Sequence, residues 1–461
     1  MSNIFFKIFT KQILIILLGV LLLFILTRFY NLDHRMVFGW DQEQFSIKIR
    51  EMIVHHNFTL LGQRVNNDAG FFLAPYLTYL LVPFYVIFKL SPYSLYFFVI
   101  IANILFFGAS YFIIKKVFSQ KHALWFLIFW TVNFMAQTYD SIPWDPLLIP
   151  LGVITTLYCL HLVYKNNTSW KAWMILGITA GFFSHMHFQF ILILFGIMVF
   201  ILQMMRKNMV KIKNIFISLF GFLITLTPLF LFDIRNNFLN SRLFFNYFVN
   251  NSSGTPIEYS AWMTVFQTFV RPYTFIKSPT VMIFFYVVIL LCLLVLVFRK
   301  NNFFHMLYIS FLTVWLTFPF VFALYGKFPS EYYFIFLIPI ITIVLIDLCL
   351  TFKNKKIIYV MFCFLLLINI QELLYRIKPN TESMYYKNQV VEYIQKTLTG
   401  KKFIVSYDGV SVDAGFQYLF EYNNVVLSNN PADPLVQISF PAKENTKIIG
   451  RYGIYIPPEL K

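Results

Sequence analysis

The sequence predicts a polytopic helical membrane protein that carries a small soluble α/β domain at its C-terminal end. Of its 461 residues, 59% are hydrophobic and 12% are charged, whereas a soluble domain carries roughly 25% charged residues. Apolar runs of about 20 residues recur along the first 375 positions, and each is long enough to cross a hydrocarbon core about 30 Å thick. From residue 376 onward the composition is that of a soluble protein.

The basic residues predict how these spans are oriented. Lys7 and Lys11 precede the first apolar run, and clusters of Lys and Arg separate many of the later runs. Cytoplasmic loops carry an excess of Lys and Arg, so we expect a multi-pass protein of the plasma membrane with a cytoplasmic N-terminus. The same clusters account for much of the net charge of +17, so nucleic acid is not expected as a partner.

Residues 71–90 are apolar but contain Pro75 and Pro83. If this segment crossed the membrane, the later basic clusters would fall outside the cell, against the positive-inside rule. We therefore assign it to the first outer loop, residues 30–92, as a juxtamembrane or re-entrant segment. Eleven spans and an extracytoplasmic C-terminus are then expected. The approximate limits of the spans are 12–29, 93–114, 122–138, 145–164, 172–186, 188–205, 214–232, 280–298, 304–323, 332–350 and 356–375.

The division of the chain is thus a membrane domain, residues 1–375, followed by an extracytoplasmic domain, residues 376–461. In the second domain the patterns predict helices at 384–399 and 412–422, and strands at 402–407 and within 446–456. All four cysteines lie in apolar runs without metal-ligand spacing. Neither a disulfide framework nor a zinc site is therefore expected.

Residues 37–51, in the first outer loop, place Asp41 and Glu43 at the membrane edge. Acidic groups are costly there unless they are paired or functional. Apolar residues recur at helical spacing over 45–53, which predicts a short helix lying along the outer surface with an acidic first turn. Two roles remain open for Asp41: a general base facing a cavity, or the first residue of a capping box with Gln44.

A second acidic loop, residues 139–146, contains Asp140 and Asp145 on either side of Trp144. These residues either contact substrate or form a solvated turn in which Asp145 caps the next span before Pro146. Trp144 is suited equally to stacking on a sugar and to anchoring at the membrane interface.

Histidines and outer cations complete the candidates. His187 and Gln189 lie at a break between two short spans and are expected to contact substrate, while His185 is expected to be buried. Arginine forms forked contacts with phosphate oxygens. A local ion pair with Asp233 is the alternative for Arg235. The outer cations include Arg64, Arg235, Arg242, Arg271, Lys277 and Lys327.

Several of these stretches occur in an order that resembles a known family. An N-terminal span is followed by F-G-W-D-Q-E-Q, G-F-F-L-A-P-Y, D-S-I-P-W-D-P, G-F-F-S-H-M-H-F-Q and T-P-L-F-L-F-D-I-R. This order resembles bacterial GT-C fold glycosyltransferases related to the protein O-mannosyltransferase and aminoarabinose-transferase group. The resemblance covers about residues 1–350. It departs from the family at Asp145 and Asn237, where relatives often have Asn and His.

The resemblance implies a GT-C membrane domain that transfers a sugar from a polyprenyl-phosphate donor on the outer face. Asp41 matches the family's essential first-loop aspartate and is our candidate base, with Glu43 as a second acid. The acceptor is a glycan, a lipid or a protein, and membrane lipids are partners. No cofactor is certain, although a divalent cation would suit the carboxylates. The substrate-binding candidates are Trp40, Gln44, Asp140, Trp144, Asp145, His187, Gln189, Arg235, Arg271, Lys327 and Tyr332.

Two other classes of function remain as alternatives. A flippase or transporter of lipid-linked glycans would need polar groups deep in the spans and often an internal repeat, and neither is evident. An O-antigen polymerase or ligase usually has a large outer loop late in the chain, whereas the acidic residues here cluster early.

Overall fold

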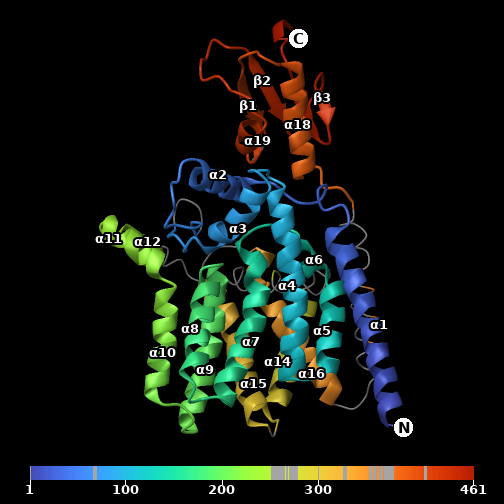
Figure 1. The fold of residues 1–461 in the computed structure, drawn as a ribbon, viewed down its shortest axis with the longest axis vertical. Helices are drawn as coiled ribbons and strands as arrows, with labels where there is room; N and C mark the ends of the chain where they lie inside the picture. Colours follow the sequence, from blue (N-terminus) through green and yellow to red (C-terminus); the bar gives the residue numbers. More distant parts are fainter. Residues whose placement is uncertain are drawn as a thin grey trace.

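The computed structural model describes residues 2–65, 70–250, 279–299, 301–324, 330–351, 378–409 and 413–460, with a few isolated positions between them. It is a helical bundle with a small domain at one end (Figure 1). The N-terminus lies at the opposite end of the bundle from that domain, and the C-terminus lies at the domain's tip. The helix and sheet content confirms the predicted fold class in its coarse form, a helical membrane domain with a C-terminal α/β unit.

Twelve elements of the described chain contribute to the bundle and its edge. They are α1 (Ser2–Phe29), α4 (Ser94–Val117), α5 (Gln120–Val132), α6 (Phe134–Tyr139), α7 (Ile149–Lys165), α8 (Trp170–Ser184), α9 (Ile191–Arg206), α10 (Ile212–Ile224), α11 (Thr227–Arg235), α14 (Pro279–Val297), α15 (Asn302–Leu324) and α16 (Leu337–Thr351).

Among the described residues, 6 helices are long and apolar enough to cross a membrane, or 7 if α10 and α11 form one bent span. Multiple crossings are therefore confirmed, but the predicted count of eleven is not. Two expected spans differ from the prediction: α16 has 15 residues and is shorter than the predicted 332–350, and the stretch 122–138 is divided at Asn133 into α5 and α6. Most of the predicted span 356–375 lies outside the described residues.

The break at Asn133 has a local cause. The Asn133 side chain accepts a hydrogen bond from the amide of Ala136 at 2.8 Å, which caps the start of α6. Asparagine is among the preferred N-cap residues because its side-chain oxygen satisfies an amide that the helix leaves unpaired. A polar residue within an apolar run thus starts a new helix.

Helices α8 and α10 pack closely because glycines replace larger side chains at their contact. A Cβ atom added at Gly177 would lie 1.9 Å from the carbonyl oxygen of Ser218, and one added at Gly221 would lie 2.7 Å from that of Met174. Small residues allow helix backbones to approach within a membrane, where dispersion contacts replace the hydrophobic effect. The pair therefore forms one wall of the bundle.

The basic ends of the helices gather at the end of the bundle away from the small domain. Lys116 donates to Tyr158, and Lys207 donates to Asn302 at 3.0 Å. At the same end, buried Asp347 accepts hydrogen bonds from His122 at 2.9 Å and from Arg299. The basic clusters in the described ranges therefore lie on the side from which the N-terminus begins (Figure 1).

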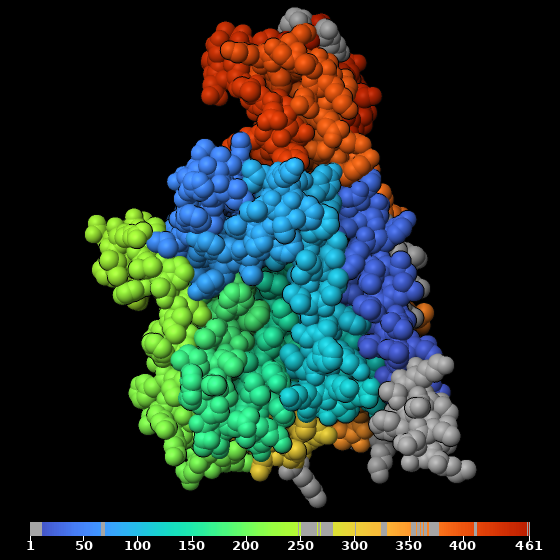
Figure 2. All heavy atoms as spheres, viewed as in Figure 1, coloured from blue at the N-terminus to red at the C-terminus, as the bar shows by residue number. Residues whose placement is uncertain are grey.

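Two short helices, α2 (Trp40–Val54) and α3 (Tyr76–Ile87), lie between the bundle and the small domain (Figure 1). Figure 2 shows this layer in blue beneath the orange domain. Helix α3 has 12 residues and is therefore roughly 18 Å long, which is shorter than a span of about 30 Å. The apolar segment 71–90 thus contains a helix too short to cross.

The C-terminal domain consists of a four-stranded sheet and two main helices. Its strands, β1 (Ile404–Asp408), β2 (Leu435–Ser439), β3 (Lys447–Ile449) and β4 (Tyr452–Tyr455), lie in the order β1-β2-β4-β3. Strands β1 and β2 are parallel, and the other pairs are antiparallel. Helices α18 (Met384–Thr397) and α19 (Phe416–Tyr422) and strand β1 agree with the predicted elements. Their apolar faces pack around Val390, Val436 and Ile438, which are fully buried.

Candidate functional site

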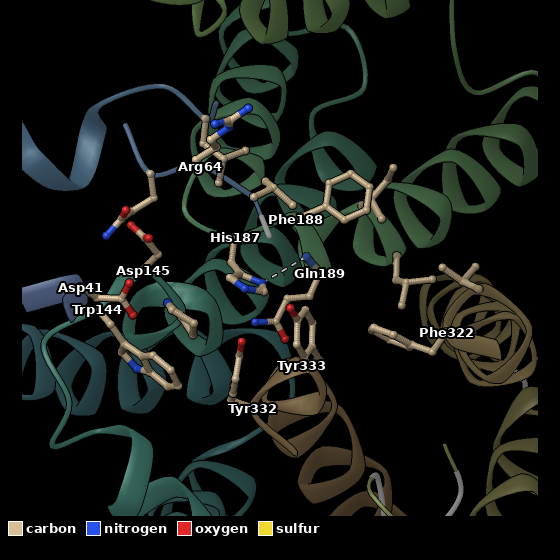
Figure 3. A pocket seen from close by; sticks show the side chains of 17 residues that line it. Asp41, Arg64, Trp144, Asp145, His187, Phe188, Gln189, Phe322, Tyr332 and Tyr333 are labelled. Atoms are coloured by element: carbon tan, nitrogen blue, oxygen red, sulfur yellow. Dashed lines mark hydrogen bonds between the residues drawn. The ribbon is translucent and has the colours of Figure 1, made fainter. Parts of the chain in front are cut away.

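A cavity of about 280 Å³ opens at the end of the bundle that faces the C-terminal domain. Its wall is built from α2, the segment 63–73, the loop before α7, the start of α9, the end of α15 and the loop before α16. Figure 3 shows side chains from these separate segments converging on one space. Six of the sequence-predicted site residues line it: Asp41, Trp144, Asp145, His187, Gln189 and Tyr332.

Asp41 reaches the cavity from the first turn of α2. The helix begins at Trp40, after the N-cap Gly39. The amide of Gly39 donates to the side-chain oxygen of Gln42 at 3.0 Å. This is the side-chain-to-backbone bond that the third residue of a helix makes in a capping box. The alternative in which Asp41 caps the helix is therefore wrong, because Asp41 already lies within it.

Asp145 approaches from another element, at the start of the short 3₁₀ helix η2 (Asp145–Leu148), which leads into α7. The side-chain amide of Gln42 donates to the carbonyl of Pro143 at 3.2 Å and so joins α2 to this loop. Figure 3 shows the two carboxylates on the same side of the cavity. Within the described residues, neither carboxylate accepts a hydrogen bond from a protein donor.

The environment of Asp41 favours its neutral form. Burial raises the pKa of Asp41 above its ordinary value of 3.8, because removal of water penalises the charged carboxylate. Lys48, roughly two helical turns further along α2, donates to the carbonyl of Gly62 at 3.1 Å. Burial lowers the pKa of Lys48, and the carboxylate of Asp145 opposes that shift. A cation behind the two acids therefore limits their repulsion.

His187 lies at the centre of the cavity wall, before the 3₁₀ helix η3 (Phe188–Phe190). Its Nδ1 accepts from the amide of Gln189 at 3.3 Å, the contact drawn in Figure 3. Burial lowers the pKa of His187 to about 4. The ring is therefore neutral at pH 7 and carries one N–H.

The opposite part of the polar wall is aromatic. The Trp144 ring stacks on Tyr139 with centroids 5.5 Å apart and lies 4.7 Å from the ring of Tyr332. The rings of Tyr332 and Tyr333 stack at 4.5 Å. The amide group of Gln189 lies 2.7 Å from the carbonyl of Tyr333, which fastens the start of α9 to the loop before α16. Trp144 is thus held in place by its neighbours and faces the cavity.

Arg64 is a cavity cation that we did not include among the substrate-binding candidates. Residues 62–65 lie beside residues 70–73, with the amide of Leu73 donating to the carbonyl of Gln63 at 2.9 Å. Arg64 Nε donates to the carbonyl of Gly70 at 2.9 Å, and its guanidinium lies 5.3 Å from the centre of the Phe72 ring. The signal in the sequence was a lone arginine in a turn-rich part of the first outer loop.

Helix α12 (Leu239–Asn250) braces this segment from outside. Asn240 accepts from the amide of Phe72 at 2.7 Å and donates to its carbonyl at 3.1 Å. Asp233 accepts from the amide and hydroxyl of Ser241. These bonds explain why Asp233 does not act as the local partner of Arg235, which is exposed at the end of α11.

Five predicted site residues have other partners or lie away from the cavity. Asp140 is buried against Arg28, with 3.3 Å between Nε and Oδ2, and also accepts from the Trp130 indole at 3.2 Å. This pair links α1 to the loop after α6, so Asp140 is a structural residue instead of a substrate contact. Arg235 lies outside the set of cavity-lining residues.

Glu43 is the second correction. Its carboxylate accepts hydrogen bonds from the amides of Gly415 and Tyr418, at 2.9 and 3.1 Å. Burial raises the pKa of Glu43, and these amides oppose the shift. Glu43 therefore faces the C-terminal domain and not the cavity. Trp40, 47% exposed, and Gln44 also do not line the cavity, while Arg271 and Lys327 lie outside the described residues.

The residues that could hold a metal ion are few. In the part of the chain that the structure describes, no group of three or more His, Cys, Asp or Glu side chains is placed to do so. Asp41 and Asp145 both line the cavity, and carboxylate oxygens are among the ligands that Mg²⁺ takes in proteins, together with water and substrate phosphate.

Comparisons with known proteins give one family match. Residues 73–232 match the family model described as dolichyl-phosphate-mannose-protein mannosyltransferase. The match runs from just before α3 into α11, so it includes Trp144, Asp145, His187 and Gln189 but not Asp41. It confirms the family resemblance that the sequence predicted for this part of the chain. Among curated protein sequences, none matches.

Solved structures of two kinds resemble the fold. ArnT from Cupriavidus metallidurans in the apo state has 13% sequence identity and a TM-score of 0.48, over 96% of this chain and 97% of that one. ArnT bound to undecaprenyl phosphate has 12% identity and a TM-score of 0.46, over 96% and 98%. The Archaeoglobus fulgidus oligosaccharyltransferase in the apo form has 13% identity and a TM-score of 0.49, over 92% of this chain and 61% of that one.

Proposed function

We propose that this chain is a GT-C type glycosyltransferase that transfers a sugar from a polyprenyl-phosphate donor to an acceptor on the extracytoplasmic face. The family match over residues 73–232 supports a glycosyltransferase. The observation that carries the proposal is the cavity, in which two carboxylates and an arginine from separate segments meet at the end of the membrane bundle. The acceptor is a glycan, a lipid or a protein.

The two halves of the cavity suit an amphiphilic donor. One half presents the carboxylates, His187 and Arg64, whereas the half beside α15 is apolar (Figure 3). A lipid-phosphate sugar has a polar head and an isoprenoid tail, so it can place its phosphate near Arg64 and its chain along the apolar wall. Burial of that chain contributes roughly 25 cal/mol per Å². The apolar wall consists of Phe188, Ile191, Leu192, Val321 and Phe322.

In the proposed reaction Asp41 acts as the general base. As the acceptor hydroxyl attacks C1 of the sugar, a new C–O bond forms, the bond from C1 to the phosphate oxygen breaks, and the hydroxyl proton passes to Asp41. The lipid phosphate leaves with the bond's electron pair. Attack from the face opposite the leaving phosphate inverts the configuration at C1. In this proposal Arg64 and the N–H of the neutral His187 ring stabilise the charge that develops on the phosphate.

Asp145 is the second carboxylate of this proposal, in the place that the sequence had given to Glu43. It either orients the acceptor hydroxyl or, with Asp41, holds a divalent cation against the phosphate. Trp144 offers an aromatic face on which a sugar ring can stack. Both acids line the same side of the cavity (Figure 3), which supports a shared task.

The orientation of the protein follows from the basic clusters and can be measured directly. The end of the bundle that carries Lys116 and Lys207 is expected to be cytoplasmic, and the cavity and C-terminal domain extracytoplasmic. A reporter fused after Lys461 should lie outside the cytoplasm. A reporter inserted after Lys213 should lie in the cytoplasm. Two reporters on the same side of the membrane would contradict the proposed orientation.

Replacing Arg64 by Ala should weaken donor use. Hydrogen bonds to charged groups contribute about 1.5–3 kcal/mol, so the KM for a polyprenyl-phosphate sugar should rise by roughly 10–100-fold. Purified protein in detergent, assayed over a range of donor concentrations, gives this value. Arg64→Lys should recover part of it, since the charge remains but the forked geometry is lost.

Arg235→Ala is the matched control, because Arg235 is exposed and lies away from the cavity. Its KM should equal that of the wild type. If Arg64→Ala leaves the donor KM unchanged while the control behaves as expected, Arg64 does not contact the phosphate. A wild-type protein that transfers no sugar from any polyprenyl-phosphate donor would refute the proposed function itself.

A further inference from the structure

The two acidic residues of α2 point in opposite directions. Successive residues of an α-helix are turned by about 100° around its axis, so Asp41 and Glu43 lie roughly 200° apart. Asp41 faces the cavity, and Glu43, with 5% of its surface exposed, faces the C-terminal domain. A displacement of the Glu43 side must therefore move the Asp41 side as well.

The contacts of Glu43 form a closed set with the start of α19. Its two carboxylate oxygens accept from the amides of Gly415 and Tyr418. Lys387, on α18, donates to the carbonyl of Phe38 at 2.8 Å and to that of Ala414 at 2.7 Å. Burial of a charge is costly unless hydrogen bonds compensate it, and here an opposite charge and two amides do so. We call these six residues the α2 latch: Phe38, Glu43, Lys387, Ala414, Gly415 and Tyr418.

Gly415 of the latch packs closely against the backbone of Phe38. Gly415 has φ of +91°, and a Cβ atom added to it would lie 2.4 Å from the carbonyl oxygen of Phe38. Only glycine therefore combines this backbone conformation with this approach. Phe38 lies three positions before Asp41, so the domain rests directly on the start of the helix that carries the proposed base.

Other contacts extend the same surface in both directions. Before the latch, the amide of Met384 donates to the carbonyl of Met36 at 3.1 Å, and Val37 pairs with Ser383. Beyond it, Arg50 at the far part of α2 forms an ion pair with Glu421 of α19. The domain thus contacts α2 at both ends, and the latch lies at the N-terminal end, which carries Asp41.

We propose that Glu43 is a positioning residue, through which the C-terminal domain sets the place of Asp41 in the cavity. The inference rests on the proposed function, because it assigns the domain a task in the transfer step. Catalytic groups must be held closely, and a misplacement of 1 Å can lower a rate by about 10²-fold. The domain accordingly takes part in catalysis through the position of α2, although none of its described residues lines the cavity.

Two variants weaken the latch from opposite sides. Glu43→Gln replaces one acceptor oxygen by a donor that faces an amide, and Gly415→Ala introduces the Cβ that would meet Phe38. Gly400→Ala is the matched control, because Gly400 also has a positive φ, +76°, but nothing within 4 Å of the added atom. The control therefore imposes the same kind of backbone strain without touching the interface.

The readouts are amide hydrogen exchange in the full-length protein and transfer kinetics with a polyprenyl-phosphate sugar. In both latch variants, exchange should rise at residues 415–418 and in the first turns of α2. The kcat should fall by about 10–100-fold while the donor KM changes by less than about 2-fold, because the phosphate contacts are intact. Gly400→Ala should match the wild type in both measurements.

Increased exchange at residues 415–418 with an unchanged kcat would overturn the positioning role and leave the latch as an attachment only. Unchanged exchange in both variants would also overturn it, since the latch would not then hold the domain. These outcomes differ from failure of the proposed function, in which the wild-type protein itself would transfer no sugar.

Discussion

The Asp41→Asn variant should transfer sugar about 10²–10⁴-fold more slowly than the wild type while remaining folded. Loss of a general base typically lowers a rate by this factor, because the amide cannot accept the proton of the acceptor hydroxyl. The fold should be preserved because Gly39 and Gln42, not Asp41, form the cap of α2. Weaker interaction with the helix dipole costs only about 0.3–1 kcal/mol. Transfer from a lipid-linked donor and thermal unfolding, measured on the same preparation, give both values.

The pH dependence of the wild type provides a second measure of the same group. Burial raises the pKa of Asp41 above 3.8, and only the deprotonated carboxylate can act as a base. The rate should therefore fall as the pH is lowered through this raised pKa, with a midpoint above the ordinary value for aspartate. Asp41→Glu keeps a carboxylate and should retain part of the activity. A rate for Asp41→Asn close to that of the wild type would leave the proposed mechanism without a base.

Replacing Asp140 by Ala should destabilise the protein by about 3–5 kcal/mol, the usual cost of leaving one member of a buried ion pair alone. Arg28 has a fully buried side chain, and Asp140 is its charged partner. The remaining contacts of Arg28, to the carbonyls of Trp130 and Thr131, do not neutralise its charge. Thermal unfolding and the yield of monodisperse protein in detergent measure the loss.

A double variant separates this structural role from substrate binding. Arg28→Met combined with Asp140→Leu removes both charges and should recover most of the lost stability, because an apolar pair of similar volume needs no compensation. The recovered protein should bind donor as the wild type does. If the double variant is nearly as stable as the wild type but has a much higher KM for the donor, Asp140 contacts the substrate after all.

Local features of the sequence predicted the local structure well. The helical spacing of apolar residues over 45–53 corresponds to α2, in which Phe45, Ile49 and Met52 are buried. The change of composition near residue 376 marks the small domain, and its main elements follow the predicted pattern. These features were predictable because a helix face or a strand is encoded by neighbours within a few positions.

The partners of the acidic residues could not be predicted in the same way. Glu43 is bound by backbone amides that follow it by more than 370 positions. Every residue except proline has such an amide, so the sequence does not mark which ones bind Glu43. Asp140 is paired with Arg28, 112 positions before it, at the end of the first span. Arg64 lines the cavity because residues 62–65 pair with residues 70–73 and Lys48 of α2 bonds to Gly62. Each depends on the tertiary fold and not on a motif.

The bend of 59° between α10 and α11 turns the chain away from the bundle. Beyond it, α11 and α12 turn aside from the bundle at the cavity end (Figure 1) and expose Phe230, Ile234 and Phe245. Apolar side chains on helices that lie along a leaflet settle among the upper acyl chains, while Asn240 fastens α12 to the segment that carries Arg64. We therefore expect the height of the Arg64 segment relative to the headgroups to follow the hydrocarbon thickness of the bilayer, so that the proposed transfer rate varies with the acyl length of the lipid.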